Sequence, residues 1–431
     1  MNNPQEPNLS AKTPRSFSLK LNFSWTFAGN VVYALCQWGM LSVMAKLGNA
    51  QMVGQFALGL AITAPFYMFS NLQLRGILAS DSQNQNSFNE YVGLRILASF
   101  IAFLLIVLTV FIAGYPLQTA IVIILIGIAK GAESVSDIIF GLLQKNERMD
   151  RVAISLMYKG IASLLLLGVL VWSTENIIFG VAGYALAFVG ILAVYDLYSS
   201  RRYEKIQPTF SISSLWPLIR ISAPMGVVML LISLNTNIPR YFIESFMSIE
   251  QLGFFSAISY VMVAGTTVVG ALGQSAVPRL SKYYAGNNKN DFVGLMKKLL
   301  IIGFLLGLGG VLIVLFMGEK ILTIMYRPEY GQYTNVFLLI MIGSGIGYVA
   351  SFLGYAMTSA RKYSIQPYIF LLVLLSSVLS CFWLVPRQGL IGAAWSLIIS
   401  SVVNLLGSGF VNLKAIRELK NNKQQPSKQS L

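Results

Sequence analysis

Three charged side chains stand in the middle of an otherwise apolar stretch, residues 117–143. Lys130, Glu133 and Asp137 lie near its centre. The stretch is long enough to cross a bilayer, since a crossing needs about 20 mostly apolar residues, and spacings of three and four put the charges on one helical face. Because a charge near the bilayer centre costs about 2.5–3.5 kcal/mol on insertion scales, we expect this face to contact other helices or a water-filled cavity.

These charges admit two functional interpretations and one structural interpretation. Lys130 could bind an anionic ligand, with Glu133 holding it while the site is empty. Glu133 or Asp137 could instead carry a proton or a sodium ion that couples transport to the membrane potential. The structural alternative is a Lys130–Glu133 pair that neutralises itself between helices. The sequence leaves all three open.

Other reactive residue types are scarce. The chain has no histidine, and its two cysteines, Cys36 and Cys381, fall inside apolar segments, as packing residues do. We therefore expect no enzyme activity, no metal site and no other cofactor. Residues 1–17 are polar and contain proline, so we expect no cleavable signal peptide.

The composition indicates a membrane protein. Hydrophobic residues make up 55% of the chain and charged residues only 11%, with a mean hydropathy of +0.67, whereas soluble domains carry about 25% charged residues. The net charge of +15 comes from short basic runs between apolar segments rather than from a basic surface with interleaved aromatic residues. Nucleic acid is therefore not an expected partner.

The apolar segments predict an all-α protein with about 12 transmembrane helices. We expect spans at residues 21–46, 53–78, 91–113, 117–143, 152–173, 177–198, 216–239, 252–277, 293–317, 334–359, 365–385 and 389–413. If the N-terminus is cytoplasmic, the inner connections and tails carry 22 Lys and Arg residues and the outer ones carry 5. By the positive-inside rule, we expect both termini in the cytoplasm.

Four short matches indicate an internal duplication. Residues 89–94 (NEYVGL) match 290–295 (NDFVGL) at an offset of 201, and Gly54 matches Gly253 at an offset of 199. Matches of 141 and 148 to 354 and 361, and of 178–182 to 390–394, keep the same order. Each half holds six spans, so the halves should be related by an axis along the membrane normal, around a central cavity.

This duplication predicts two bundles and three polar segments. The predicted boundaries are a cytoplasmic tail at 1–20, a first bundle at 21–198, a cytoplasmic linker at 199–215, a second bundle at 216–413 and a basic tail at 414–431.

The opening spans carry a family resemblance. Residues 22–48 (NFSWTFAGNVVYALCQWGMLSVMAKLG), 53–75 (VGQFALGLAITAPFYMFSNLQLR) and the stretch PRLSKYYA at 278–285 resemble bacterial polysaccharide flippases. These form the O-antigen (Wzx-type) branch of the multidrug/oligosaccharidyl-lipid/polysaccharide exporter superfamily. The resemblance implies a protein of the bacterial inner membrane that exports a polyprenyl-diphosphate-linked oligosaccharide by alternating access. It also implies other polysaccharide-assembly proteins as further partners.

A diphosphate crossing the membrane needs cations. Lys130 could bind its phosphate groups, and arginine binds such groups bidentately. Arg75 and Arg279 end the second and eighth spans on the inner side, and at an offset of 201 Arg75 corresponds to a position one helical turn before Arg279. We expect both to receive the diphosphate, although both could be topology anchors. Arg220, shortly before Pro224 in the seventh span, could face the cavity or extend to the inner interface.

Amides in two spans are candidates for sugar contacts. Asn30 and Gln37 lie on the first span, and Asn235 and Asn237 lie near the outer end of the seventh. The alternatives are hydrogen bonds between helices and helix capping.

Two other functions compete with the flippase. A small-molecule or drug cation antiporter of the same superfamily would use the same acids but would not need cations near the inner mouth. A membrane glycan polymerase or ligase normally has a large outer loop with reactive groups, whereas the outer connections expected here are short.

Overall fold

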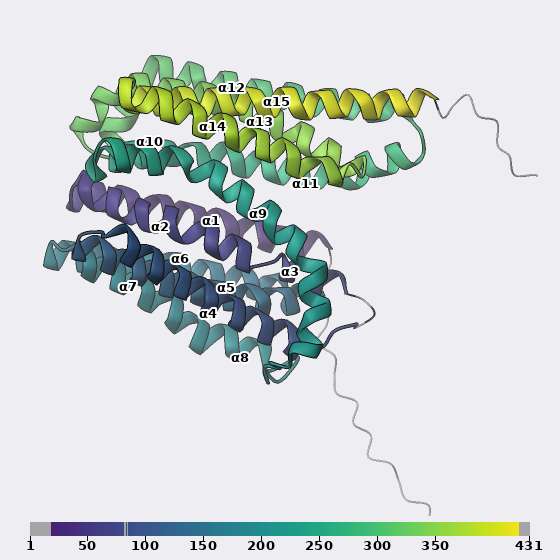
Figure 1. The fold of residues 1–431 in the computed structure, drawn as a ribbon, viewed down its shortest axis with the longest axis horizontal. Coiled ribbons are helices and arrows are strands. Elements are labelled where there is room, and N and C mark those ends of the chain that lie inside the picture. Colours follow the sequence, from purple (N-terminus) through teal and green to yellow (C-terminus); the bar gives the residue numbers. More distant parts are fainter. Residues whose placement is uncertain (1–18, 82, 84, 422–431) are drawn as a thin grey trace, which may run out of the picture.

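The computed structural model describes residues 19–421, except residues 82 and 84, and those residues form helices and short connections without a strand (Figure 1). The first half contains α1 (Leu19–Leu47), α2 (Ala50–Ser70), α3 (Leu74–Ser80), α4 (Phe88–Ala113), α5 (Leu117–Lys145), α6 (Met149–Thr174), α7 (Ile177–Ile191), the π-helical η1 (Leu192–Asp196) and α8 (Leu197–Ser200). The second contains α9 (Ile212–Phe246), α10 (Ile249–Tyr260), α11 (Met262–Ala285), α12 (Lys289–Met325), the 3-10 helix η2 (Pro328–Tyr333), α13 (Thr334–Ser359), the 3-10 helix η3 (Tyr363–Ile365), α14 (Gln366–Gln388) and α15 (Leu390–Asn421).

Twelve helical segments of the described chain are long and apolar enough to cross a membrane, which confirms the all-α fold class and the expected number of spans. The predicted linker at 199–215 is shorter in the structure, because α9 already begins at Ile212. At the other end α15 continues past residue 413 to Asn421. The predicted tails extend into residues 1–18 and 422–431, which lie outside the described residues.

The connections divide between two ends of the molecule. We call one end the basic side; it holds the connections at residues 81–87, 146–148, 201–211, 286–288 and 360–365. The opposite side holds those at residues 48–49, 114–116, 175–176, 247–248, 326–333 and 389. On the basic side Ser87 and Glu90 form a capping box that starts α4, while Gly114 ends that helix in the left-handed conformation on the opposite side.

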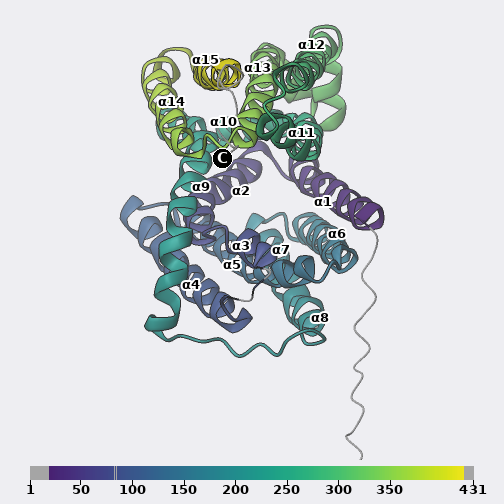
Figure 2. The ribbon, with the colours of Figure 1, turned by 90° about the vertical axis from the view of Figure 1, so that its right-hand side faces the viewer.

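The helices form two lobes that separate toward the basic side (Figures 1 and 2). The N-lobe comprises α1–α8 and the C-lobe α9–α15. On the opposite side the lobes meet where α2 crosses α10. A Cβ on Gly54 would overlap the Ile249 carbonyl, and a Cβ on Gly253 would overlap the Ala50 carbonyl. The two glycines matched in the sequence repeat therefore pack across the same lobe interface, as a two-fold relation requires.

A pair of turns on the basic side also repeats. The turn after α5 places Glu147 in the left-handed region, with the Arg148 amide bonded to the Leu143 carbonyl at 2.9 Å. The turn after α13 does the same at Arg361, and the Lys362 amide bonds to the Met357 carbonyl at 3.1 Å. Glu147 and Arg361 are 214 residues apart, one residue more than the offset of 213 at which the sequence matches residue 148 to residue 361.

Two elements depart from simple straight spans. The second span breaks between α2 and α3, where Leu72 and Gln73 both have left-handed backbone conformations (φ 48° and 53°). The seventh span, α9, contains Pro224 and passes from one lobe to the other: its end packs against α14, and its beginning lies against α2 and α4 (Figure 2). Gly226 allows this approach, because a Cβ there would lie 2.7 Å from Leu72 Cδ2.

Candidate substrate cavity

A polar cleft lies between α1 of the N-lobe and α11 of the C-lobe, with a volume of about 640 Å³. Hydroxyl and amide side chains from both lobes line it, namely Thr26, Asn30, Tyr33, Thr266, Thr267, Gln274 and Ser275. Five of them, Thr26, Asn30, Thr266, Thr267 and Ser275, donate to carbonyls of their own helix, and their oxygen atoms remain available as acceptors. Such a lining suits a ligand with many hydroxyl groups.

Hydrogen bonds join the lobes on the opposite side. Trp38 Nε1 donates to the Tyr326 hydroxyl at 3.2 Å, and Ser42 Oγ donates to the Met325 carbonyl at 2.5 Å. Arg327 Nη2 donates to the Lys46 carbonyl at 2.8 Å. No ion pair joins the lobes within the residues that the structure covers. The lobes are therefore held together on the opposite side without an ion pair in the described chain, and they separate toward the basic side (Figure 1).

Lys130 and Glu133 form an ion pair beside the cleft. Lys130 Nζ lies 2.6 Å from Glu133 Oε2, and the Tyr33 hydroxyl donates to Glu133 Oε1 at 3.0 Å. The two charged side chains are 25% and 29% exposed. Tyr33 also lines the cleft, so it connects the pair to the polar lining. The pair is therefore partly exposed, and its two charges neutralise each other.

Arg240 on α9 is a cation of the C-lobe in the same region as this pair. Its Nη1 donates to Asn237 Oδ1 at 2.6 Å, and no carboxylate of the described chain pairs with it. Tyr260 lies close enough to Lys130, Glu133 and Arg240 for their charges to interact with it. Both lobes therefore contribute a cation to one region of the membrane interior, and Arg240 carries an unneutralised charge there.

Arg75 and Asp137 belong to a separate cluster inside the N-lobe. Asp137 accepts from Arg75 Nη1 at 3.3 Å and from Arg95 Nη2 at 3.1 Å. Arg95 is completely buried and also donates to Asn71, at the break between α2 and α3, and to Ser134. With two arginines for one aspartate, the cluster keeps one positive charge. The Asp137 carboxylate is paired with both arginines.

A second buried pair joins α6 to η1. Lys159 Nζ lies 2.6 Å from Asp196 Oδ2, the side chains are 1% and 0% exposed, and Ser155 donates to the other carboxylate oxygen at 2.6 Å. Phe140 lies between the two clusters, with the Lys159 ammonium 4.9 Å and the Arg75 guanidinium 5.7 Å from its ring centroid. Cations above an aromatic ring are attracted to it, so Phe140 links the clusters.

The remaining predicted residues are dispersed. Arg279 and Arg220 are exposed, and within the described chain neither forms an ion pair. Asn30 lines the cleft, whereas Gln37 is buried in the N-lobe outside that lining. Asn235 Nδ2 donates to the Phe370 carbonyl of α14, a contact between helices, with a distance of 3.1 Å.

Arg95, Lys159 and Asp196 escaped the sequence interpretation because their partners lie on other helices, 42 and 37 residues away. The only available signal was the rarity of a charge inside an apolar span. The predicted seventh span ends at residue 239, just before Arg240, whereas α9 continues six residues beyond Arg240 to Phe246.

The twelve helical segments of membrane-spanning length form two lobes around a polar cleft. This arrangement defines a multi-pass membrane transport protein. The chain belongs to the polysaccharide biosynthesis protein family, which it matches over residues 19–284. This membership and the fold confirm the resemblance to the exporter superfamily.

Comparisons with individual proteins agree in fold and length. The chain is 29% identical to the capsular polysaccharide biosynthesis protein CapF of Staphylococcus aureus over 389 residues, which cover 89% of this chain and 97% of the relative. Its fold is similar to an inward closed structure of the lipid II flippase MurJ, with a TM-score of 0.73, 15% identity and coverage of 95% and 94%. It is also similar to an inward-facing multidrug resistance MATE family transporter of the MOP superfamily, with a TM-score of 0.69, 11% identity and coverage of 92% and 96%.

Proposed function

We propose that this protein is a flippase that moves a polyprenyl-diphosphate-linked oligosaccharide, a surface-polysaccharide repeat unit, from the cytoplasmic to the outer leaflet of the bacterial inner membrane. The observation that carries the proposal is the polar cleft, with Lys130 of the N-lobe and Arg240 of the C-lobe in the same region of the membrane interior, in a member of a polysaccharide biosynthesis family. The names of CapF and MurJ support the substrate class. The basic side then faces the cytoplasm, as the positive-inside rule requires.

The cleft and an adjoining pocket fit the two parts of such a substrate. The sugar occupies the polar cleft. Beside it lies an apolar pocket of about 360 Å³ that shares Phe27, Ala34 and Thr267 with the cleft. Leu35 and Val268, which line this pocket, are 59% and 44% exposed at membrane depth. The prenyl chain therefore stays in contact with lipid between α1 and α11 while the sugar is sheltered.

The diphosphate moves between cations as the lobes rock. Arg279, exposed on α11, and Arg75 receive it near the basic side, and Lys130 and Arg240 hold it deeper in the membrane. When phosphate takes over Lys130, Glu133 loses its ion-pair partner and becomes available to a proton or a sodium ion. This exchange couples substrate arrival to ion uptake, and it requires no covalent step.

A leaflet assay tests the proposal. Vesicles with the purified protein carry a fluorescent polyprenyl-diphosphate disaccharide, and a membrane-impermeant quencher reports the leaflet. We expect the protein to accelerate exchange over protein-free vesicles, and Arg240→Gln and Lys130→Gln to remove most of that acceleration. Folded protein that leaves exchange unchanged but moves a cationic dye across the membrane would contradict the flippase and favour the antiporter. Transferred or polymerised sugar would favour an enzyme.

A further inference from the structure

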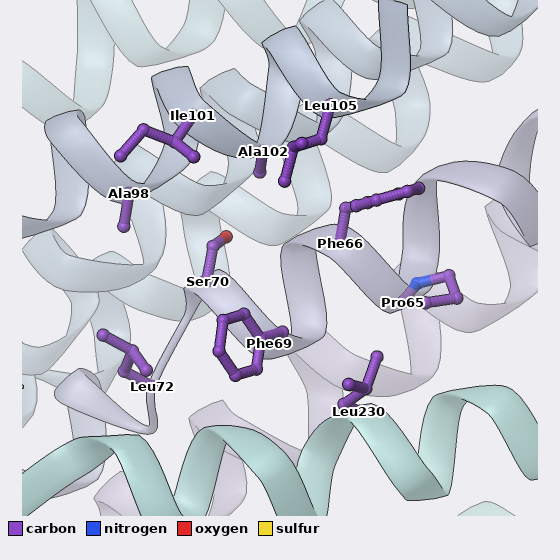
Figure 3. Close-up of a pocket in the computed structure, with 10 residues that line it drawn as sticks. All are labelled: Pro65, Phe66, Phe69, Ser70, Leu72, Ala98, Ile101, Ala102, Leu105 and Leu230. Atoms are coloured by element: carbon purple, nitrogen blue, oxygen red, sulfur yellow. The ribbon is translucent and has the colours of Figure 1, made fainter. Parts of the chain in front are cut away.

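An apolar pocket lies on the other seam between the lobes, where α9 rests against α2 and α4 (Figure 3). Its volume is about 350 Å³, and nine of its ten lining side chains are apolar. The exception is Ser70, whose hydroxyl already donates to the Tyr67 carbonyl at 3.2 Å. Figure 3 shows Leu230 of α9 facing the α2 side chains across the pocket. A pocket with this lining offers a ligand no free polar group.

The pocket opens toward the hydrocarbon. Phe69, Ile101 and Leu105 line it and are 41%, 49% and 43% exposed, within segments that span the membrane. At this depth only apolar groups can fill an opening without losing hydrogen bonds to water. An alkyl chain from the bilayer is therefore the chemistry that fits.

One face of α9 continues from this pocket to the basic side. Spacings of four, seven and three place Trp216, Arg220, Val227 and Leu230 on that face. Trp216 and Val227 are 61% and 45% exposed, and Arg220 is exposed without an ion pair in the described chain. Ten residues of helix separate Arg220 from Leu230, about 15 Å, which matches half of a hydrocarbon core of about 30 Å. A cation with a tryptophan beside it suits an anionic headgroup at the interface.

We propose that this seam binds one anionic phospholipid of the leaflet on the basic side, with its headgroup on Arg220 and an acyl chain in the pocket between α2, α4 and α9. Two walls of the pocket belong to the N-lobe, and the third, α9, comes from the C-lobe. A chain seated there contacts both lobes only while α9 rests on the N-lobe, so the lipid favours the arrangement in which the cleft is open to the basic side.

Native mass spectrometry of the full-length protein, titrated with phosphatidylglycerol or phosphatidylcholine, tests the site. Ile101→Trp fills the pocket, and Leu108→Trp is its matched control, since Leu108 lies on the same helix, is 51% exposed and does not line the pocket. We expect one phosphatidylglycerol to bind in preference to phosphatidylcholine. Ile101→Trp and Arg220→Gln should each weaken it about fivefold or more, whereas Leu108→Trp should not.

Three results would overturn the proposal: equal binding by the two tryptophan variants, no preference for phosphatidylglycerol, or displacement of that lipid by a polyprenyl phosphate, which would assign the pocket to the substrate chain. If Ile101→Trp does not fold, a photolabelling experiment on the unaltered protein takes its place. A phosphatidylglycerol with a photoreactive acyl chain must then label α4 or α9. None of these results depends on flippase activity.

Discussion

At the scale of residues, the membrane interior holds charges that are mostly neutralised within the N-lobe. Glu133, Asp137 and Asp196 each contact a lysine or an arginine of that lobe. Arg240 is different, because its recorded partner is the neutral Asn237. An unpaired guanidinium inside a membrane is costly, and an anionic substrate would offset that cost.

Replacing Arg240 by Gln should therefore reduce flipping strongly without unfolding the protein. The loss of one charged hydrogen-bond contact of about 1.5–3 kcal/mol corresponds to a reduction of roughly ten- to a hundredfold. Arg387→Gln is the matched control. Arg387 is exposed at the end of the molecule opposite the basic side, where its guanidinium lies over the Trp383 ring. Equal flipping rates for Arg240→Gln and the control in the leaflet assay would show that Arg240 does not contact the substrate.

The Lys159–Asp196 pair gives a second residue-scale prediction. Lys159→Met leaves a buried carboxylate without its cation and should lower the free energy of unfolding by about 3–5 kcal/mol. Adding Asp196→Leu should restore most of the loss, because two apolar groups then replace two charges.

Thermal unfolding in detergent measures both variants. Full flipping by the stable double variant would show that the pair serves stability alone. If the double variant is as unstable as Lys159→Met, the unpaired Asp196 carboxylate is not the cause of the destabilisation, and the prediction is wrong.

At the scale of elements, closure on the opposite side depends on the glycines where α2 crosses α10. Gly54→Val places a side chain where the Ile249 carbonyl lies, so the lobes could no longer close there. We expect a folded protein without flipping activity, in which thiol reagents reach cysteines introduced into this interface. Gly309→Val on α12 is the control, because a Cβ there meets no atom within 4 Å. Normal flipping by Gly54→Val would contradict the assigned role of the crossing.

The sequence predicted the elements better than their contacts. A span is recognisable because about 20 apolar residues must run together, whatever they pack against. The Lys130–Glu133 pair was also predictable, since both residues lie three apart on one helix. Arg95 and Asp137 lie on different helices, and their contact depends on how α4 packs against α5. The break at Leu72 was not predictable either, because its left-handed backbone carries no glycine and is supported by neighbouring helices.

At the scale of the whole molecule, the two lobes differ although their spans repeat. Among the described residues, five of six ion pairs lie in the N-lobe, and the remaining one, Lys362–Glu418, lies at the basic end of the C-lobe. The seams differ as well: α1 and α11 leave a polar cleft, whereas α9 covers the other seam. The proposed substrate path between α1 and α11 therefore lies at the polar seam, while α9 joins the lobes at the other one.

The central claim is that substrate crosses between lobes that rock, and a reversible cross-link tests it most directly. Lys46→Cys and Arg327→Cys place thiols at a lobe contact on the opposite side, while the native Cys36 and Cys381 are buried. A reducible bifunctional thiol reagent should stop flipping in the double variant, a reducing agent should restore it, and the single variants should be unaffected. Flipping at an unchanged rate with the lobes fully cross-linked would contradict the account.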